Sequence, residues 1–558
     1  MPATANSAPA SDEFDGRGTV VNTARQRLRT LAPYIAPAAL ALIVGAMAAI
    51  MFASHRSGHW WGDDWALYLR QANGLLDGDP GRVTDENRFA VEMSRGAAFS
   101  PPLYPWGFPL ILAAFVAVLG NDLDRLTIVP VLSACLFACA WYLLAKPRIG
   151  TLAALTGVGA VTLTPLLLGW TELIQSEWPF LAVTAVVLVG LDRAAESGVL
   201  TRVDGALLPL VGLGIGATAA FSVRREGLAM VAAIAAAQVA ALIAERRERW
   251  WRDRSTAGTL VARLLVPHTT ALLTVGLLQF ALPSTLVPRY SGTSVANVWR
   301  FADDHIDHLA EVAGLKRAWE SNPTIFDSVA LGWIAVGAYL LLATLGIALA
   351  LTRNRRRDLH LVAYAVVAFM IGGSFRVPIN RYVCTVAPLL LLLAAVAIRT
   401  VVGNRRLPAL STIVVMLALA GIVAGNIGNA NIRVDRATRF AERGLIEWGA
   451  THPEAIAMFD AVIQFTDQDD VIAAPKARAI TFETGRLAVQ LDAHRPIPTA
   501  VEPDLFVTEV GTDLTDVLLN QPELFSVVWR NSRFVLFQPS NPANASMNGD
   551  GSSSTASP

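Results

Sequence analysis

Residues 33–68 read PYIAPAALALIVGAMAAIMFASHRSGHWWGDDWALY, and this stretch decides the architecture. Its first part, residues 33–53, contains no charged side chain, and a helix needs about 20 apolar residues to cross the hydrocarbon core of a membrane. Three tryptophans and the adjacent acids Asp63 and Asp64 follow at 60–65. Indole rings prefer the membrane interface, so the pattern predicts an anchor helix that leads to a carboxylate pair near the lipid headgroups.

The composition of the whole chain is that of a membrane protein. The sequence has 558 residues, of which 53% are hydrophobic and 16% charged, and its mean hydropathy is +0.45. Soluble proteins carry about 25% charged residues, so this composition argues against a soluble enzyme. The 45 basic and 45 acidic side chains balance, which leaves no basic field and argues against a nucleic-acid partner. The cysteines lie inside apolar runs and are predicted to be packing residues: Cys135, Cys139 and Cys384.

Eleven apolar runs reach or approach the length of a membrane crossing. They lie at residues 33–53, 126–145, 150–169, 178–193, 205–221, 227–244, 264–283, 327–351, 359–375, 383–399 and 408–428. Residues 1–32 contain no apolar core of a signal peptide, so we expect a cytoplasmic, disordered N-terminus and a first run that is retained as an anchor. The sequence therefore predicts a mainly α, polytopic membrane protein with about eleven transmembrane helices.

Arginines and lysines indicate the orientation, because short cytoplasmic loops are enriched in them. If each of the eleven runs crosses once, all the basic clusters fall on one side. The clusters are Arg25, Arg27 and Arg29; Lys146 and Arg148; Arg193 and Arg202; residues 245–254; residues 353–357; and Arg405 and Arg406. That side is predicted to be the cytoplasm.

A twelfth apolar run, residues 103–120, would reverse the side of every later cluster if it also crossed. It is short and begins among Pro101, Pro102, Pro105 and Pro109, which suit a full crossing poorly. We interpret it as a helix that lies in, or dips into, the outer leaflet. The alternative of an ordinary twelfth crossing stays open.

The predicted topology places residues 54–125, residues 283–326 and everything after about 431 on the outer side. We expect a small extracytoplasmic α/β domain over residues 431–540 and a disordered tail over residues 541–558. Strands are predicted at 470–474, 479–482, 525–529 and 533–537, and helices at 437–448 and 455–465.

The acids Asp63 and Asp64 stand at the start of a helical pattern that continues through Tyr68. The N-terminus of a helix stabilises a carboxylate, and a carboxylate at the membrane surface could act as a general base. The same two residues could equally serve as caps of that helix. The pattern does not decide between these roles.

Four arginines lie in short outer loops, against the bias that keeps positive charge in the cytoplasm. They are Arg224, Arg225, Arg376 and Arg381. Arginine is suited to hold a phosphate because its planar fork donates two hydrogen bonds and keeps its proton. The alternative is that these side chains reach toward anionic lipid headgroups.

Further acidic residues could bind a metal or a substrate. Glu172 and Glu177 lie in a tight outward turn, where they could hold a metal, contact the acceptor or cap the next helix. The segment DDHIDH at 303–308 contains two pairs of possible ligands four residues apart, Asp303/Asp307 and Asp304/His308. An amphipathic surface helix explains the same segment, and no third ligand can be assigned, so a metal site stays an open question.

Five short segments, taken in order, resemble the GT-C glycosyltransferases, which are polytopic enzymes that use polyprenyl-phosphate sugars. The resemblance is to the dolichyl-phosphate-mannose mannosyltransferase-like and aminoarabinose-transferase-like branch, and it covers about residues 33–400. The matching pieces are Asp63 to Tyr68 with Ala72 and Gly74; Pro101 to Leu110; Leu163 to Leu166 with Ser176 and Glu177; Arg224 to Gly227; and Arg381, Tyr382 and Pro388.

This resemblance implies a GT-C-like transmembrane domain over residues 33–430. In that family an acid in the first outer loop deprotonates the acceptor hydroxyl, and basic residues hold the lipid phosphate that leaves. Asp64 best matches the family's spacing of acid and aromatic residue. In this sequence, however, Trp65 stands where the family has a second acid, and the extra acid, Asp63, comes before Asp64. The resemblance therefore leaves the choice between Asp63 and Asp64 open. It also implies a single displacement that inverts the anomeric centre.

The predicted function is extracytoplasmic transfer of a sugar from a polyprenyl-phosphate donor to a hydroxyl of a glycan, lipid or protein. The predicted base is Asp64 or Asp63, the phosphate-binding residues are Arg224, Arg225, Arg381 and Arg376, and the substrate contacts are Tyr68, Glu177, Glu226 and Tyr382. No cofactor is firmly implied. The richness in Ala and Arg is compatible with a bacterial plasma membrane.

Three other functions fit parts of the sequence. A transporter or flippase of a lipid-linked or anionic substrate would also place Arg and Asp in a membrane cavity, although the internal repeats typical of transporters are not evident. A polymerase or ligase that uses polyprenyl-diphosphate oligosaccharides would keep the enzyme class and change the donor. A GT-C scaffold that has lost its activity is disfavoured by the intact acids and arginines.

Overall fold

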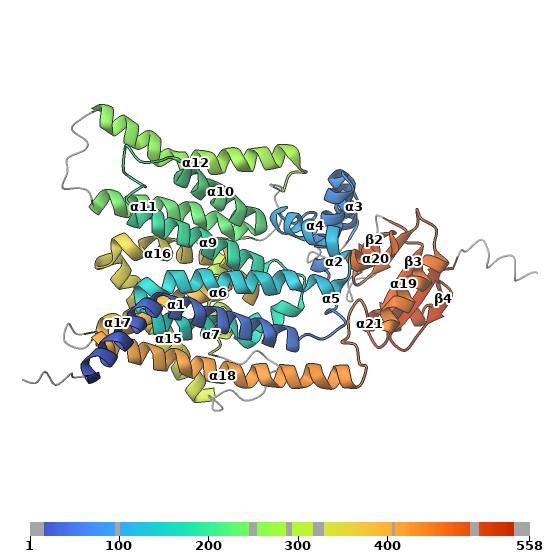
Figure 1. The fold of residues 1–558 in the computed structure, drawn as a ribbon. Helices are drawn as coiled ribbons and strands as arrows, with labels where there is room; N and C mark the ends of the chain where they lie inside the picture. Colours follow the sequence, from blue (N-terminus) through green and yellow to red (C-terminus); the bar gives the residue numbers. More distant parts are fainter. Residues whose placement is uncertain are drawn as a thin grey trace, which may run out of the picture.

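The computed structural model describes residues 16–94, 101–244, 254–285, 293–315, 329–375, 377–403, 408–491 and 501–540. Residues 1–15 of the N-terminus predicted as disordered, Arg376, the basic residues at 245–253, Arg405 and Arg406, and the tail at 541–558 lie outside these ranges. Residues 16–32, also predicted as disordered, are helical. Within them, the structure consists of a bundle of long helices, a group of short helices at one end of the bundle, and a small C-terminal sheet (Figure 1).

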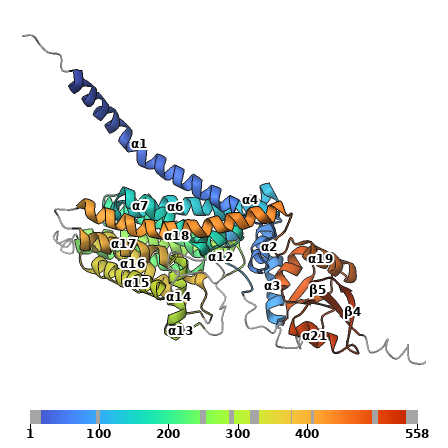
Figure 2. The ribbon, with the colours of Figure 1, turned by 90° about the horizontal axis from the view of Figure 1, so that it is seen from below.

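Each of the eleven predicted runs coincides with a helix or with a broken helix. The helices are α1 Gly16–Ala53, α6 Ile128–Ile149, α7 Thr151–Thr162 with α8 Pro165–Gly169, α9 Glu177–Glu196, α10 Leu208–Val223, α11 Ala229–Ala244, α12 Arg254–Ala281, α15 Val329–Thr352, α16 Arg355–Gly373, α17 Val386–Val402 and α18 Pro408–Glu442. Most of them lie side by side, whereas α1 leaves the bundle at an angle (Figure 2).

In the described part of the chain, seven helical segments are long and apolar enough to cross a membrane. The pair α7 and α8 passes the same test together, with a bend of 58°, whereas α10 and α17 are apolar but shorter. These segments support a polytopic membrane protein. The predicted number of eleven crossings stays a prediction.

Charged residues at the end of the bundle far from the sheet agree with the predicted grouping of basic clusters. Arg148, at the end of α6, donates to both carboxylate oxygens of Asp192 in α9 at 2.6 and 2.8 Å and to Asp358 in α16 at 2.7 Å. Arg399, at the end of α17, donates to the carbonyl oxygen of Arg148. The clusters around 146–148, 193 and 353–357 therefore meet at one end of the bundle.

The run at 103–120 forms the short helix α4, Gly107–Leu119. Thirteen residues span about 20 Å, which is less than the roughly 30 Å of a hydrocarbon core. At its first residue, a Cβ on Gly107 would lie 2.6 Å from the carbonyl oxygen of Ser222, so the backbone of α4 touches the end of α10. The structure thus gives α4 a length that is too short for a straight crossing.

Several short helices and single turns accompany the long helices. They are α2 Asp64–Leu76, α3 Pro80–Met93, α5 Leu123–Leu126, α13 Val295–Arg300 and α14 Ala302–Val312, with single turns η1 Trp170–Glu172, η2 Arg225–Leu228 and η5 Asn380–Val383. In both views α2 and α3 lie between the bundle and the sheet (Figures 1 and 2).

The C-terminal unit has a five-stranded sheet in the order β2-β1-β3-β5-β4. β1 pairs in parallel with β2 and β3, β5 is antiparallel to β3 and β4, and Ile472 stands opposite Ala488 and Leu505. The strands are β1 Val471–Ala474, β2 Leu487–Gln490, β3 Leu505–Glu509, β4 Phe525–Arg530 and β5 Phe534–Pro539, and the helices are α19 Pro453–Phe465, α20 Ala477–Thr484 and α21 Asp513–Leu519.

One prediction for this unit was wrong and another was wrong in part. The segment 479–482, predicted as a strand, lies inside helix α20, because a short apolar run has the same letters in a buried helix as in a strand. The helix predicted at 437–448 is helical to Glu442, as the end of α18, and residues 443–448 are not helical.

Two of the three tryptophans predicted at the membrane interface, Trp61 and Trp65, pack against the C-terminal unit, whereas Trp60 is 59% exposed. Trp61 is 8% exposed, lies 5.8 Å from the ring of Phe534 and donates its indole N–H to Glu509 at 3.1 Å. Trp65 is 1% exposed and meets Phe482 of α20 edge-on at 5.4 Å. The apolar surface of the sheet domain covers these rings in place of lipid.

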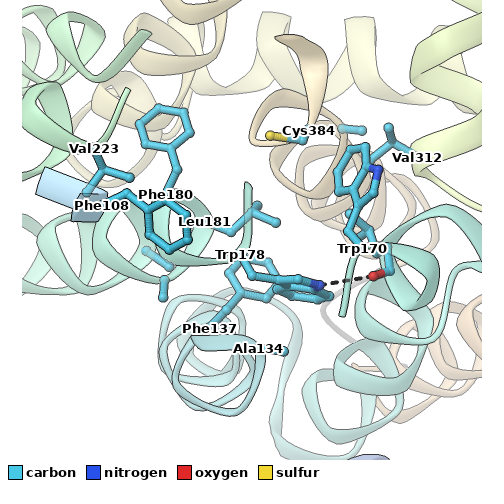
Figure 3. Close-up of a cluster of buried hydrophobic side chains, with 14 of the residues drawn as sticks. Phe108, Ala134, Phe137, Trp170, Trp178, Phe180, Leu181, Val223, Val312 and Cys384 are labelled. Carbon is cyan, nitrogen blue, oxygen red and sulfur yellow. Dashed lines mark hydrogen bonds between the residues drawn. The ribbon is translucent and has the colours of Figure 1, made fainter. Parts of the chain in front are cut away.

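A buried cluster of aromatic and aliphatic side chains fixes the ends of several bundle helices (Figure 3). Trp178 is fully buried, contacts Phe137 at 5.9 Å and donates its indole N–H to the carbonyl oxygen of Leu167 at 3.0 Å. Val223 and Cys384 belong to the same cluster. Trp178 directly follows Glu177, and Val223 directly precedes Arg224, so this core positions two of the charged residues at the helix ends.

Candidate active site

Asp64 is the first residue of α2, and side chains from three distant parts of the chain surround its carboxylate. Arg381 Nη1 donates to Oδ2 at 2.7 Å, the Tyr104 hydroxyl donates to Oδ1, and Arg478 Nη1 lies 3.7 Å from Oδ1. Burial alone would raise the pKa of Asp64, but the two guanidinium groups and the tyrosine hydroxyl outweigh it and lower the pKa to about 2. Asp64 is therefore a carboxylate at neutral pH, and 26% of its side chain remains exposed.

Asp63 has a different partner. Its side chain makes no capping hydrogen bond to α2; its Oδ1 accepts the backbone N–H of Ala479, in the first turn of α20, at 3.0 Å. Burial raises the pKa of Asp63, although Arg478 opposes this shift. The alternative that the Asp63 side chain caps α2 is therefore wrong, because its carboxylate instead accepts from the first turn of a helix in the C-terminal unit.

Glu177 connects the arginines to one another. It is the first residue of α9 and is fully buried, and its Oε1 accepts from Arg224 Nη1 at 2.6 Å and from Arg381 Nε. Arg224 also donates to Glu226 Oε1 at 2.9 Å. Charged side chains therefore form one chain of ion pairs in the order Asp64, Arg381, Glu177, Arg224, Glu226.

Backbone geometry explains why the loop after α10 can present two of these residues. Arg224 is the extended residue that ends α10, and η2 folds back on it directly. A Cβ on Gly227 would lie 2.4 Å from the carbonyl oxygen of Ala220, so only glycine allows this close return of the chain. Arg224 and Glu226 can therefore pair across a tight turn.

Aromatic rings surround the ion pairs. The Tyr68 ring stacks on Tyr104 at 4.4 Å, and its hydroxyl lies 3.1 Å from that of Ser176, which is also 3.5 Å from Arg224 Nη1. Burial raises the pKa of Tyr68, and Asp64 raises it further, so this hydroxyl stays protonated. The guanidinium of Arg224 lies over the ring of Tyr382 at 5.8 Å.

The loop that leads to Asp63 is held in a strained path. His59 has a φ of 47°, which L residues rarely adopt, and its Nε2 accepts the backbone N–H of Ile174 at 3.0 Å. Burial lowers the pKa of His59 to about 4, so the ring is neutral and can accept this bond. A Cβ on Gly449 would lie 1.5 Å from the His59 carbonyl oxygen, and the C-terminal unit therefore locks this loop by backbone contact.

The structure brings most of the predicted site residues into one cluster. They are Asp64, Tyr68, Glu177, Arg224, Glu226, Arg381 and Tyr382. Arg225 is half-buried, and Arg376 lies outside the described residues. The roles of all these side chains in binding or catalysis stay predictions.

Sequence reasoning missed two contributors to the site. Tyr104 lies in the proline-rich segment that was matched to the GT-C family, so a signal for it was present. Arg478 lies in the C-terminal unit, directly before the segment 479–482 that was predicted as a strand, and nothing in its surroundings marked it as a site residue.

The remaining acidic candidates have other positions. Glu172 accepts from Arg56 at 3.0 Å and from Arg433 at 2.9 Å, so it ties the first outer loop to α18. The segment 303–308 lies in α14, whose His305 is buried against Phe369 at 5.6 Å. Over the ranges that the structure describes, no group of three or more His, Cys, Asp or Glu side chains has the arrangement of a metal site.

A polar groove of about 780 Å³ lies between α2, α3 and the C-terminal unit. Its lining includes Arg70, Asn73, Asp77, Glu86, Thr481 and Phe482. Helices α2 and α20 therefore carry ion-pair residues at their first turns and groove residues further along.

Comparison with known proteins agrees with the predicted resemblance. The family model of dolichyl-phosphate-mannose-protein mannosyltransferases matches residues 100–273. ArnT from Cupriavidus metallidurans bound to undecaprenyl phosphate is a similar solved structure, with a TM-score of 0.51 and 14% identity over 89% of this chain and 97% of that chain. Its apo state has the same identity and coverage and a TM-score of 0.50.

More distant matches carry less weight. The apo oligosaccharyltransferase of Archaeoglobus fulgidus has a TM-score of 0.47 and 11% identity over 85% of this chain and 70% of that chain. No curated protein matches the chain in sequence. At such low identity a similar structure shows a shared fold, and the family model provides the separate sequence match. Together they confirm the resemblance to the GT-C glycosyltransferases and the predicted class of enzyme: the chain is a membrane protein with the GT-C glycosyltransferase fold.

Proposed function

We propose that this chain transfers a sugar from a polyprenyl-phosphate donor to an acceptor hydroxyl on the extracytoplasmic side of the membrane. Asp64 is the general base, and Arg381 and Arg224 hold the donor phosphate. The single observation that carries this proposal is the position of Arg381, which joins the partly exposed carboxylate of Asp64 to the fully buried Glu177. A base and a phosphate-binding cation are thereby in direct contact.

The low pKa of Asp64 suggests how the donor activates it. A carboxylate with a pKa of about 2 is a weak base, and general bases work best when their pKa is near the working pH. The donor phosphate is an anion that competes with Asp64 for Arg381. As Arg381 turns to the phosphate, Asp64 loses its strongest cationic partner and its basicity rises.

The chemical step then balances as a single displacement. Asp64 accepts the proton of the acceptor hydroxyl, the hydroxyl oxygen forms a bond to the anomeric carbon, and the bond from that carbon to the phosphate oxygen breaks. The polyprenyl phosphate leaves with one more negative charge than it carried in the donor. Arg381 and Arg224 stabilise this developing charge, and a displacement from the face opposite the leaving group inverts the anomeric centre.

The acidic partners of the arginines serve as supports in this proposal. Glu177 and Glu226 fix the two ends of the Arg224 guanidinium, and Tyr382 lies beneath it. Tyr68 and Ser176 line the same site with hydroxyl groups that can bind a sugar. The polar groove beside α2 and α20 supports a polar acceptor on the same face.

Two observations support the side of the membrane and the kind of donor. The site lies at the end of the bundle opposite the cluster around Arg148, and basic clusters favour the cytoplasm. The similar fold of ArnT, which binds undecaprenyl phosphate, supports a polyprenyl-phosphate donor. By the same reasoning, the protein belongs in the plasma membrane with the sheet domain outside.

The test is a transfer assay with purified protein in lipid, a panel of radiolabelled polyprenyl-phosphate sugars and an envelope extract as acceptor. Asp64→Asn should lower transfer by a factor of about 100 or more, which is the typical contribution of a general base. Asp63→Asn is the matched control and should retain most activity, because an amide oxygen can still accept from Ala479. Transfer by Asp64→Asn at the wild-type rate, or no transfer from any donor by folded wild type, would contradict the proposal.

A further inference from the structure

Arg478 belongs to the C-terminal unit but extends its guanidinium into the site. Its side chain is 3% exposed. Nη1 donates to the Tyr104 hydroxyl at 3.2 Å, and Nη2 donates to the carbonyl oxygen of Pro101 at 2.8 Å. The guanidinium also lies 5.5 Å from the centre of the Tyr104 ring. The same hydroxyl of Tyr104 donates to Asp64, so Arg478 supports the partner of the proposed base.

Residues from the first outer loop hold Arg478 in this position. Asp63 caps the first turn of α20 through the N–H of Ala479, the residue after Arg478. One turn further along α20, Phe482 contacts Trp65, the residue after Asp64. The acid pair and its neighbour thus bind the helix that carries Arg478 at two points.

Asp64 faces charged and titratable groups on every element packed against it. They are Arg381 from η5, Arg478 from α20, Tyr104 from the segment before α4, Asp63 directly before α2, Tyr68 on α2, Glu177 of α9 beyond Arg381, and Lys476 near Asp63. Only Arg381 and Arg478 are cations within 4 Å of Asp64 among the described residues.

The two cations differ in their other bonds. Arg381 is bound to carboxylates, which an anionic donor can replace, whereas Arg478 is bound to a hydroxyl and a carbonyl oxygen of the protein. When the donor phosphate binds Arg381, Arg478 is the cation that remains beside Asp64.

We propose that Arg478 is a positioning residue that keeps Asp64 ionised and aligned through Tyr104 while the donor occupies Arg381. The C-terminal unit therefore completes the active site. This inference rests on the proposed function, because it assigns Asp64 the role of the base.

The expected consequence has a definite sign. Removing the positive charge of Arg478 makes the ionised form of Asp64 less stable. The pKa of Asp64 therefore rises, and the base becomes protonated at higher pH. Transfer by the variant is then lost on the acid side, where wild type is still active. The donor KM stays unchanged, because Arg478 does not contact the phosphate in this account.

The experiment compares wild type, Arg478→Gln, Arg478→Lys and Arg486→Gln. Arg486 is the matched control, since it lies in the same unit and donates to the carbonyl oxygen of Thr466 at 3.1 Å, away from Asp64. We expect the acid limb of the kcat–pH profile to move to higher pH by about one unit in Arg478→Gln, which corresponds to a tenfold change in the ionisation constant of the base. In Arg478→Lys the acid limb should return most of the way to its wild-type position, and Arg486→Gln should match wild type.

Parallel variants separate the possible failures. If Asp64→Asn abolishes transfer and Arg478→Gln keeps the wild-type pH profile, the inference is overturned and the proposed function stands. If Asp64→Asn transfers sugar at the wild-type rate, both the proposed function and the inference that rests on it are wrong. Should Arg478→Gln fail to fold, Tyr104→Phe removes the hydroxyl between Arg478 and Asp64, and an unchanged pH profile in that variant also overturns the inference.

Discussion

Replacing Arg381 by alanine removes the side chain that joins the proposed base to the proposed phosphate site. In the resting structure Arg381 donates to Asp64 at 2.7 Å and to Glu177, and 22% of its side chain is exposed. A hydrogen bond to a charged group contributes about 1.5–3 kcal/mol, so the loss of one such bond to a donor phosphate should weaken binding by a factor of about 10 to 150.

Binding can be measured without any knowledge of the sugar or the acceptor. Undecaprenyl phosphate is titrated into purified protein in nanodiscs, and the Kd of Arg381→Ala is compared with that of wild type. Arg433→Ala is the matched control, because Arg433 pairs with Glu172 at 2.9 Å, is 29% exposed and lies outside the chain of ion pairs that contains Asp64. An Arg381→Ala protein that is folded and binds within about twofold of wild type would refute the phosphate-binding role, since it corresponds to less than about 0.5 kcal/mol.

Other predictions test the supports of the site. Asp63→Ala removes the cap of α20, which should cost about 1 kcal/mol, lower the unfolding temperature and speed proteolysis of the C-terminal unit; an unchanged proteolysis rate would contradict the docking role. Arg148→Ala removes the guanidinium that pairs with the buried Asp358 and with Asp192 at the far end of the bundle, and should destabilise the protein by about 3–5 kcal/mol, while transfer per folded molecule stays at the wild-type level. Gly449→Ala should disrupt the loop before Asp63, because its Cβ would lie 1.5 Å from the His59 carbonyl oxygen. Gly421→Ala should be tolerated, because no atom lies within 4 Å of its Cβ. Equal unfolding temperatures for the two variants would contradict this prediction.

The sequence predicted the bundle well because lipid imposes a length on each apolar run. All eleven runs coincide with helices or a broken helix, and Glu177, Arg224 and Arg381 stood out because they interrupt such runs at their ends. Membrane burial makes charges costly, so those that occur at the ends of helices are easy to recognise.

The roles of Asp63 and Asp64 could not be separated in the same way. The difference between them depends on Ala479 and Arg478, which approach only through the tertiary fold. The prediction that Trp61 and Trp65 lie at the lipid interface was wrong because it, too, depends on the tertiary fold. Their rings are covered by the C-terminal unit, and no local pattern distinguishes an aromatic ring that faces lipid from one that faces protein.

Arg478 itself was hidden by the ambiguity of short apolar segments. Residues 479–482 have the composition of a strand but belong to a helix of eight residues, α20. A helix this short takes its conformation from its contacts, in this case with Asp63 and Trp65. Hydrophobic periodicity therefore could not identify α20 as a helix that contributes to the site.

The most direct test of the central claim separates donor binding from transfer in Asp64→Asn. Undecaprenyl phosphate binding and single-turnover transfer of a radiolabelled sugar are measured on the same preparation of wild type and variant. We expect donor binding close to wild type and transfer reduced by a factor of about 100 or more. Wild-type transfer by Asp64→Asn, with binding intact, would contradict the assignment of Asp64 as the base.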